Sequence, residues 1–219
     1  MDLEFINQYT PLYIEASLLT IRIAVFGIVG SMILGLLCSL IRYYKIPVLQ
    51  RIFGIYIELS RNTPLLIQLF FLYFGLPRAG IVLSSETCAT VGLIFLGGSY
   101  MSEAFRSGLE SVSESQIEAG LSLGLTKVQV IRYILLPQAI SVSVPAFAAN
   151  VIFMIKETSV FSAVALADLM YLAKDLIGLY YKTNEALLML VIAYLIILLP
   201  LSIIFTIIER KLRYAGFGN

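Results

Sequence analysis

The chain has 219 residues, of which 59% are hydrophobic and 13% are charged, and its mean hydropathy is +0.93. A soluble domain carries about 25% charged residues, so this composition indicates an integral membrane protein. The formal net charge is +1 and histidine is absent, which argues against a nucleic-acid-binding surface and removes the usual metal ligand and general base.

The composition also argues against several enzyme classes. No Gly-x4-Gly-Lys-Ser/Thr motif occurs, so we do not expect the chain to hydrolyse nucleotide through a P-loop. Cys38 and Cys88 are far apart in apolar surroundings, which predicts buried packing residues rather than a disulfide. Asp2 and Glu4 replace the basic start of a signal peptide, so the first apolar segment is expected to be retained. We expect a non-catalytic protein without a cofactor.

Apolar segments of about 20 residues, the length that crosses a bilayer, recur along the chain. We expect five spans, at about residues 12–41, 48–76, 86–106, 140–158 and 187–208. Gly27, Gly30 and Gly35 offer small faces for helix packing in the first span, and Gly97-Gly98-Ser99 does so in the third. Pro64 is expected to bend the second span.

A polar loop, residues 111–138, separates the third and fourth spans. Its apolar positions recur at helical spacing, which predicts short helices bent at Gly124. The small Ala119 and Gly120 would let another surface approach the backbone closely. An ordinary amphipathic helix at the membrane surface is the alternative, but it explains neither the Gly124 break nor the later Leu136-Pro137.

The distribution of lysine and arginine predicts the orientation, because cytoplasmic loops carry an excess of both. With the N-terminus outside and the C-terminus in the cytoplasm, the inside loops hold Arg42, Lys45, Arg51, Arg106, Lys127, Arg132, Arg210, Lys211 and Arg213. The outside loops then hold Arg78, Lys174 and Lys182. This orientation places residues 111–138 in the cytoplasm.

Charged side chains within the spans mark candidate sites, because a charge at membrane depth normally faces a cavity or a partner. Glu58 and Arg61 lie three residues apart on one helix face, as a structural ion pair or as a ligand site in which Arg61 binds a carboxylate and Glu58 an ammonium. Asn62 and Thr63 lie beside them, and Pro64 frees a backbone carbonyl there.

Other polar positions are weaker candidates for the same site. Lys156-Glu157-Thr158-Ser159 predicts a helix break that suits ion or zwitterion binding. Ser99 could line a pore or pack helices, and Glu103 lies one turn from the inner end of its helix, where solvation is the simpler explanation. Asp168, with Lys174 and Asp175, is expected on the wet face of an outside segment, and Arg22 is expected to pair with an acid on a neighbouring helix.

The stretch Glu118-Ala119-Gly120, then Gly124, then Leu136-Pro137 resembles the EAA loop of binding-protein-dependent ABC transporter permeases. The second span, YIELSRNTPLLIQLFFLYFGLP from Tyr56, and Lys156-Glu157-Thr158-Ser159 resemble signatures of the polar amino acid uptake branch. The resemblance implies an all-α membrane permease with a cytoplasmic coupling helix between its third and fourth spans. It also implies a second permease chain, two ATPase subunits that contact the loop, an extracytoplasmic solute-binding protein and a location in the bacterial or archaeal cytoplasmic membrane.

The functional hypothesis is therefore the permease subunit of an importer for polar amino acids. Four acids (Glu15, Glu58, Glu103, Glu157) outnumber three bases (Arg22, Arg61, Lys156) in or near the spans, which favours arginine, lysine or histidine. Glu58 would bind the cationic group, and the carboxylate would contact Arg61, Asn62, Thr63, Thr158 or Ser159. Glutamine, glutamate or an opine is the alternative solute, and a membrane anchor without transport activity is the alternative function.

Overall fold

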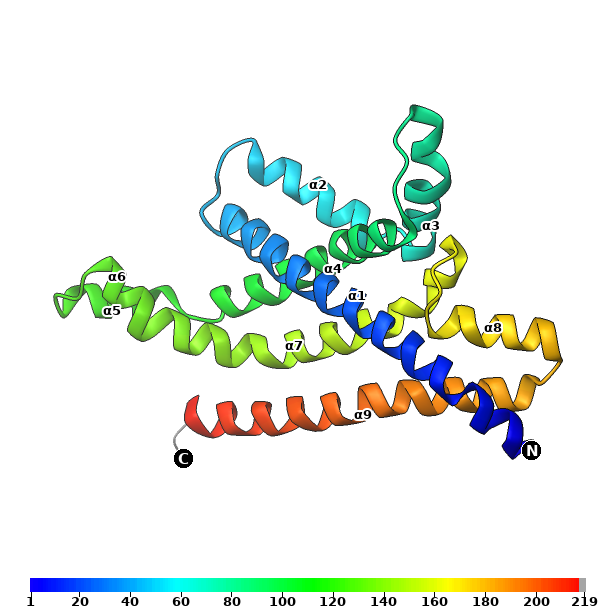
Figure 1. Ribbon diagram of the computed structural model, residues 1–219. Helices are drawn as coiled ribbons and strands as arrows, with labels where there is room; N and C mark the ends of the chain where they lie inside the picture. The colour runs from blue at the N-terminus through cyan, green and yellow to red at the C-terminus, as the bar shows by residue number, and fades with distance from the viewer. Residues whose placement is uncertain (217–219) are drawn as a thin grey trace.

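The computed structural model describes residues 1–216, with side chains described as far as Leu212, so that the side chain of Arg213 lies outside this part. Every regular element in this part is helical, as expected (Figure 1). The α-helices are α1 (Leu3–Tyr43), α2 (Leu49–Arg61), α3 (Leu65–Phe70), α4 (Ser85–Glu110), α5 (Glu114–Ser122), α6 (Lys127–Val130), α7 (Leu136–Glu157), α8 (Leu169–Tyr180) and α9 (Thr183–Gly216). Tighter or wider helical turns over Phe71–Gly75, Leu76–Ala79, Ile131–Leu135 and Thr158–Val164 continue α3, α6 and α7.

Four helical segments within the described residues are long and apolar enough to cross a membrane. They are Leu3–Tyr43, Ser85–Glu110, Lys127–Val164 and Thr183–Leu212. The expected second span is divided at Asn62–Pro64 into α2 and a shorter apolar helical segment, Leu65–Ala79. The division follows from Pro64, which has no amide hydrogen and disfavours helical geometry in the residue before it.

The most extensive contact between two helices in the described chain is that of α1 with α4, and small residues allow it. A methyl group on Gly27 would strike Leu93, one on Gly30 would strike Ile94, and one on Gly35 would strike the backbone at Met101–Ser102. The three glycines therefore let the two helices cross closely, as the sequence predicted.

The centre of α4 packs against three other helices. A side chain on Gly97 would meet Met154 of α7 and Ser31 of α1, and one on Gly98 would meet Tyr56 of α2. Ser99 is fully buried, donates to the Leu96 carbonyl at 2.7 Å and contacts the Ser60 hydroxyl at 3.1 Å. Of the two uses considered for this stretch, the structure shows helix packing.

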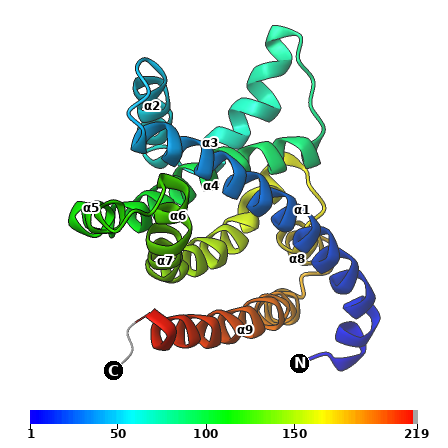
Figure 2. The ribbon, with the colours of Figure 1, turned by 90° about the vertical axis from the view of Figure 1, so that its left-hand side faces the viewer.

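The polar loop forms a helical hairpin that projects from one end of the molecule (Figures 1 and 2). Helix α5 ends before Gly124, whose φ of +84° is left-handed and favours glycine, and α6 follows after Thr126, which caps it. Gly120 is buried, and a side chain there would strike Ile134 and Val130 of the same hairpin. Its small size therefore serves packing within the hairpin, which corrects the expectation that it lets a partner approach.

At the opposite end, the start of α1 packs beside the turn between α8 and α9 (Figure 1). The Lys182 ammonium lies 2.9 Å from Asp2, and the Asp2 amide donates to Glu185. Asp168 departs from expectation: it is fully buried and one carboxylate oxygen accepts from the Tyr171 amide, which caps α8. The wet face of α8 thus includes Lys174 and Asp175 but excludes Asp168.

Candidate functional site

The break between α2 and α3 exposes three polar side chains, Arg61, Asn62 and Thr63. Pro64 cannot donate to the Ser60 carbonyl, four residues earlier, so this carbonyl instead accepts from the side-chain amide of Gln68 at 3.1 Å. The Thr63 hydroxyl donates to the Leu59 carbonyl at 2.8 Å. The carbonyl that proline was predicted to free is therefore present, and a side chain bonds it.

A second interruption follows α7. The α-helix ends at Glu157, tightens into a 3₁₀ turn over Thr158–Val164, and reverses only at Ala165, whose φ is +55°. The break expected at residues 156–159 is thus a change of helix type, and the change of direction comes later. Glu157 is half-buried, whereas Lys156 is exposed.

The two interruptions border one open cavity of about 330 Å³. Polar groups from both breaks face an apolar wall: the lining residues are Arg61, Asn62, Thr63, Pro64, Leu65, Leu66, Leu96, Tyr100, Phe153, Glu157 and Val160. The cavity thus holds one guanidinium and one carboxylate, contributed by helices far apart in sequence.

Within the described chain, the Arg61 guanidinium contacts an aromatic ring and not an acid. Its guanidinium carbon lies 5.2 Å from the centre of the Tyr100 ring, a cation–π contact that fixes its direction, and no acid pairs with it among the described residues. The Glu58 carboxylate instead accepts from the Asn62 amide at 3.2 Å. The Glu58–Arg61 ion pair, one of two readings of the sequence, is therefore not formed here.

Tyr100 and Phe153 supply the aromatic wall, with ring centres 5.1 Å apart. The Asn150 side-chain amide donates to the Tyr100 carbonyl at 3.2 Å and ties α7 to α4 at this level. Sequence reasoning did not select these two aromatics. The available signal was spacing, because Leu96 with Tyr100 and Phe153 with Glu157 each lie four residues apart on one helix face.

The remaining candidates from the sequence do not line the cavity. Glu58 reaches it only through Asn62, and Lys156 and Ser159 are outside its lining. Ser99 and Asp168 are fully buried elsewhere. Thr158 is also buried, donates to the Ile155 carbonyl at 2.7 Å and lies 3.3 Å from the Tyr194 hydroxyl.

Glu103 belongs to a separate cluster of charges. One carboxylate oxygen accepts from Arg42 of α1 and the other accepts from Arg106, which also pairs with Glu110. The Arg42, Glu103 and Arg106 side chains are 22–33% exposed. This closed network, rather than interfacial solvation alone, accounts for a carboxylate at this position. Arg22 pairs with Glu86 at 2.8 Å, as expected of it.

The tip of the hairpin presents apolar side chains to solvent. Leu123 is 84% exposed and Val128 is 72% exposed, and Glu118 and Ala119 are exposed beside them. Leu136 and Pro137 are exposed where α7 begins. Apolar side chains so fully exposed on a polar hairpin are typical of a surface that contacts another protein. No cluster of three or more potential metal ligands occurs among the described residues.

Comparison with known proteins agrees with this architecture. Residues 13–214 match the family described as "Binding-protein-dependent transport system inner membrane component". The chain is 35% identical over 215 residues to the "Probable amino-acid permease protein YxeN" of Bacillus subtilis, with 97% of this chain and 96% of that protein covered. It is 33% identical over 205 residues to the "Glutamine transport system permease protein GlnP" of Escherichia coli, covering 93% and 94% respectively.

Two solved structures extend the likeness to three dimensions. A crystal structure of an amino acid ABC transporter with histidines contains a chain with a TM-score of 0.89 and 30% identity, and 96% of this chain and 99% of that chain are covered. An inward-facing MetNI methionine ABC transporter shares the fold, with a TM-score of 0.73 at 20% identity, covering 97% and 99%. The chain belongs to the family of binding-protein-dependent transport system inner membrane components, the non-catalytic permease subunits of ABC transporters.

Proposed function

We propose that the chain forms the translocation path of an ATP-driven importer for polar amino acids, and that the cavity at the two helix interruptions binds the solute. The observation that carries this proposal is the presence of an unpaired guanidinium and a carboxylate around one cavity. A zwitterion brings the two complementary charges, a carboxylate for the guanidinium and an ammonium for the carboxylate.

The arrangement of groups predicts how the solute lies. The planar Arg61 guanidinium suits a carboxylate, and the Asn62 and Thr63 side chains lie beside it. Glu157, on the opposite helix, would accept from the ammonium group. The side chain of the solute would then face Leu96, Tyr100 and Phe153. Transport needs moderate affinity, and an open cavity with few charged contacts is consistent with binding and release.

Within this class, we propose a cationic amino acid. Glu58 bonds Asn62 at the border of the cavity, so a guanidinium or ammonium on the solute side chain could take over that carboxylate. Glutamine is the second candidate, because the single acid and single base that line the cavity already balance a neutral zwitterion, and because relatives at 33% identity are named for glutamine.

Solute-stimulated ATP hydrolysis by the reconstituted transporter tests these assignments. Arginine, glutamine and glutamate would be compared in the wild type and in Glu58→Gln. For a cationic solute, the variant should lose roughly 10-fold or more in apparent affinity for arginine and little for glutamine, because one charge-assisted bond is lost. An equal loss for both solutes, or a wild type that prefers glutamine, would assign the neutral solute. Stimulation by none of them would overturn the proposal.

The hairpin is proposed as the contact to the ATPase subunits, with Glu118, Ala119 and the exposed Leu123 and Val128 on its surface and Gly120 and Gly124 shaping it. Leu123→Ser should then reduce co-purification of the ATPase subunits without impairing membrane insertion, since it removes an exposed apolar contact. Leu179→Ser on α8, the same substitution at a leucine that is 62% exposed, is the matched control. Normal co-purification of the Leu123 variant would contradict the assignment.

The orientation and the assembly are proposed from the same arrangement. An outside N-terminus and a cytoplasmic C-terminus place the hairpin beside cytoplasmic ATPases, opposite an extracytoplasmic binding protein, with the chain in the bacterial or archaeal cytoplasmic membrane and paired with an identical copy. Because Cys38 and Cys88 are both buried, new cysteines at Lys127 and Arg78 can be labelled selectively. Lys127 should react only from the cytoplasm and Arg78 only from outside.

A further inference from the structure

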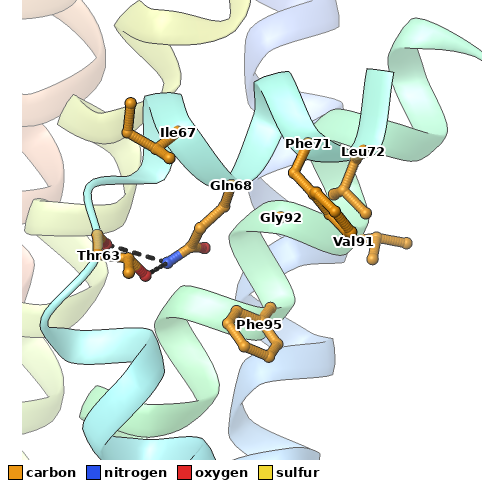
Figure 3. Close-up of a pocket in the computed structure, with 8 residues that line it drawn as sticks. All are labelled: Thr63, Ile67, Gln68, Phe71, Leu72, Val91, Gly92 and Phe95. Carbon is orange, nitrogen blue, oxygen red and sulfur yellow. Dashed lines mark hydrogen bonds between the residues drawn. The ribbon is translucent and has the colours of Figure 1, made fainter. Parts of the chain in front are cut away.

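The Gln68 side chain joins the two sides of the break between α2 and α3 (Figure 3). Its amide nitrogen donates to the Ser60 carbonyl at 3.1 Å, to the Thr63 carbonyl at 3.1 Å and to the Thr63 hydroxyl at 2.9 Å. Ser60 lies in the last turn of α2, and Thr63 is the last residue before Pro64. One side chain of α3 therefore bonds both ends of the polar segment that carries Arg61 and Asn62.

The orientation of this amide is determined by its partners. The Ser60 and Thr63 carbonyls can only accept hydrogen bonds, so the nitrogen of Gln68 must face them. The amide oxygen is consequently left buried, with no partner among the described residues. A buried acceptor without a donor is unfavourable. The hydrogen bonds donated by the amide nitrogen, and not the amide oxygen, therefore stabilise Gln68 in this position.

Thr63 lines two cavities. It borders the proposed solute cavity, and together with Gln68, Ile67, Phe71, Val91 and Phe95 it also lines an apolar cavity of about 410 Å³ (Figure 3). The Ser60 carbonyl, which Pro64 leaves without its helix donor, and the Thr63 carbonyl both accept from the Gln68 amide.

We propose that Gln68 is a positioning residue for solute binding: its amide holds the interrupted segment in the conformation that turns Arg61, Asn62 and Thr63 towards the cavity. This inference rests on the proposed function of that cavity. Without the amide, the segment gains alternative conformations, and a solute must select the binding-competent one. The apparent affinity then falls by the fraction that is competent, whereas the maximal rate of hydrolysis changes less.

Gln68→Met tests the inference, because methionine has nearly the same length and no donor. Gln50→Met, at an exposed glutamine of α2 with no side-chain hydrogen bond in the described part, is the matched control. We expect the solute concentration that half-saturates ATP hydrolysis to rise roughly 10-fold in Gln68→Met, the effect of one or two lost hydrogen bonds, and to stay unchanged in Gln50→Met.

Labelling of Asn62→Cys measures the mobility of the segment separately, without solute, because the native cysteines are buried. The labelling rate should rise in the Gln68→Met background. An unchanged rate would overturn the positioning role. A raised rate with an unchanged half-saturating concentration would also overturn it, and if Arg61→Met likewise leaves that concentration unchanged, the cavity itself is not the solute site.

Gln68→Glu provides a second variant of native shape. Its ionised carboxylate would face two carbonyl oxygens and weaken binding, whereas the protonated form regains one donor. The half-saturating concentration, relative to the wild type at each pH, should therefore fall as the pH is lowered. A ratio that does not depend on pH would contradict the role of the donated bonds.

Discussion

Two groups of charges, one around Glu103 and one at the cavity, differ in how they are satisfied. Around Glu103, each charge has a partner: Arg42 from α1 and Arg106 from α4 share one carboxylate, and Glu110 closes the network. At the cavity, the Arg61 guanidinium stacks on Tyr100 and has no acid partner in the described chain, while Glu157 faces it from another helix. A charge that lacks a partner beside a cavity is available to a ligand, and a charge in a closed network is not.

Arg61→Met removes the guanidinium from the group of charges at the cavity, the open group, and should produce the largest change in solute affinity. Loss of a bidentate charged contact corresponds to roughly 10- to 150-fold in apparent solute affinity, and the thermal stability should stay near that of the wild type because no ion pair is lost. Arg78→Met, on the turn Leu76–Ala79 and outside the lining of the cavity, is the matched control. A drop in stability with intact affinity would place Arg61 in the same class as Arg42.

Glu157→Gln sharpens the assignment of the second charge. We expect binding of an amino acid to the purified complex to weaken roughly 10-fold, because the ammonium loses its acceptor. An N-acetylated analogue carries no ammonium, so it should bind the wild type and the variant equally. Equal weakening of both compounds would show that Glu157 shapes the cavity without contacting the ammonium.

Local patterns predicted much of this molecule because their physical causes are local. The glycines of α1, the left-handed Gly124 and the break at Pro64 each follow from steric properties of one residue. The bend expected at Pro64 is a complete break of the helix over Asn62–Pro64, which divides residues 48–76 into α2 and α3.

The cavity was only partly predictable because its walls come from three separate stretches. Arg61 and Glu157 were selected as charges at membrane depth, but nothing local places them around one cavity with Tyr100 and Phe153. The converse error arose at Gly120, whose small size was assigned to a partner although Ile134, 14 residues later, occupies the space. Which surface a small residue serves depends on tertiary packing.

Glu103→Gln removes the shared carboxylate of the network around Glu103, the closed group. It should have a smaller effect, on stability rather than on solute binding. The variant leaves two guanidinium groups without their shared carboxylate, and partial exposure of all three side chains limits the loss to about 1–2 kcal/mol. Thermal unfolding of the purified complex measures it, with Glu86→Gln at the more exposed Arg22–Glu86 pair as control. Weakened solute binding at unchanged stability would move Glu103 into the open group.

The smallest effect is expected at a third group, Asp2 with Lys182, which joins α1 to the α8–α9 turn. The Lys182 ammonium, 2.9 Å away, lowers the pKa of Asp2 below its ordinary value of 3.8, and Asp2 in turn raises the pKa of Lys182 above 10.5. A lowered acid pKa stabilises the folded chain above pH 3.8, and this contribution is lost as the pH falls through the folded pKa. A raised lysine pKa stabilises it below pH 10.5, and that contribution is lost at higher pH.

Lys182→Met should therefore lower the melting temperature slightly between about pH 5 and pH 9, and the difference from the wild type should shrink below pH 4. High salt should reduce the difference as well, because both side chains are more than one third exposed and exposed pairs are screened. Lys174→Met, at an exposed lysine of α8, is the control. A difference that does not shrink at all as the pH falls below 3.8 would mean that Lys182 contributes by packing against α1 and not by its charge, and the pair would then differ in kind from the two groups compared above.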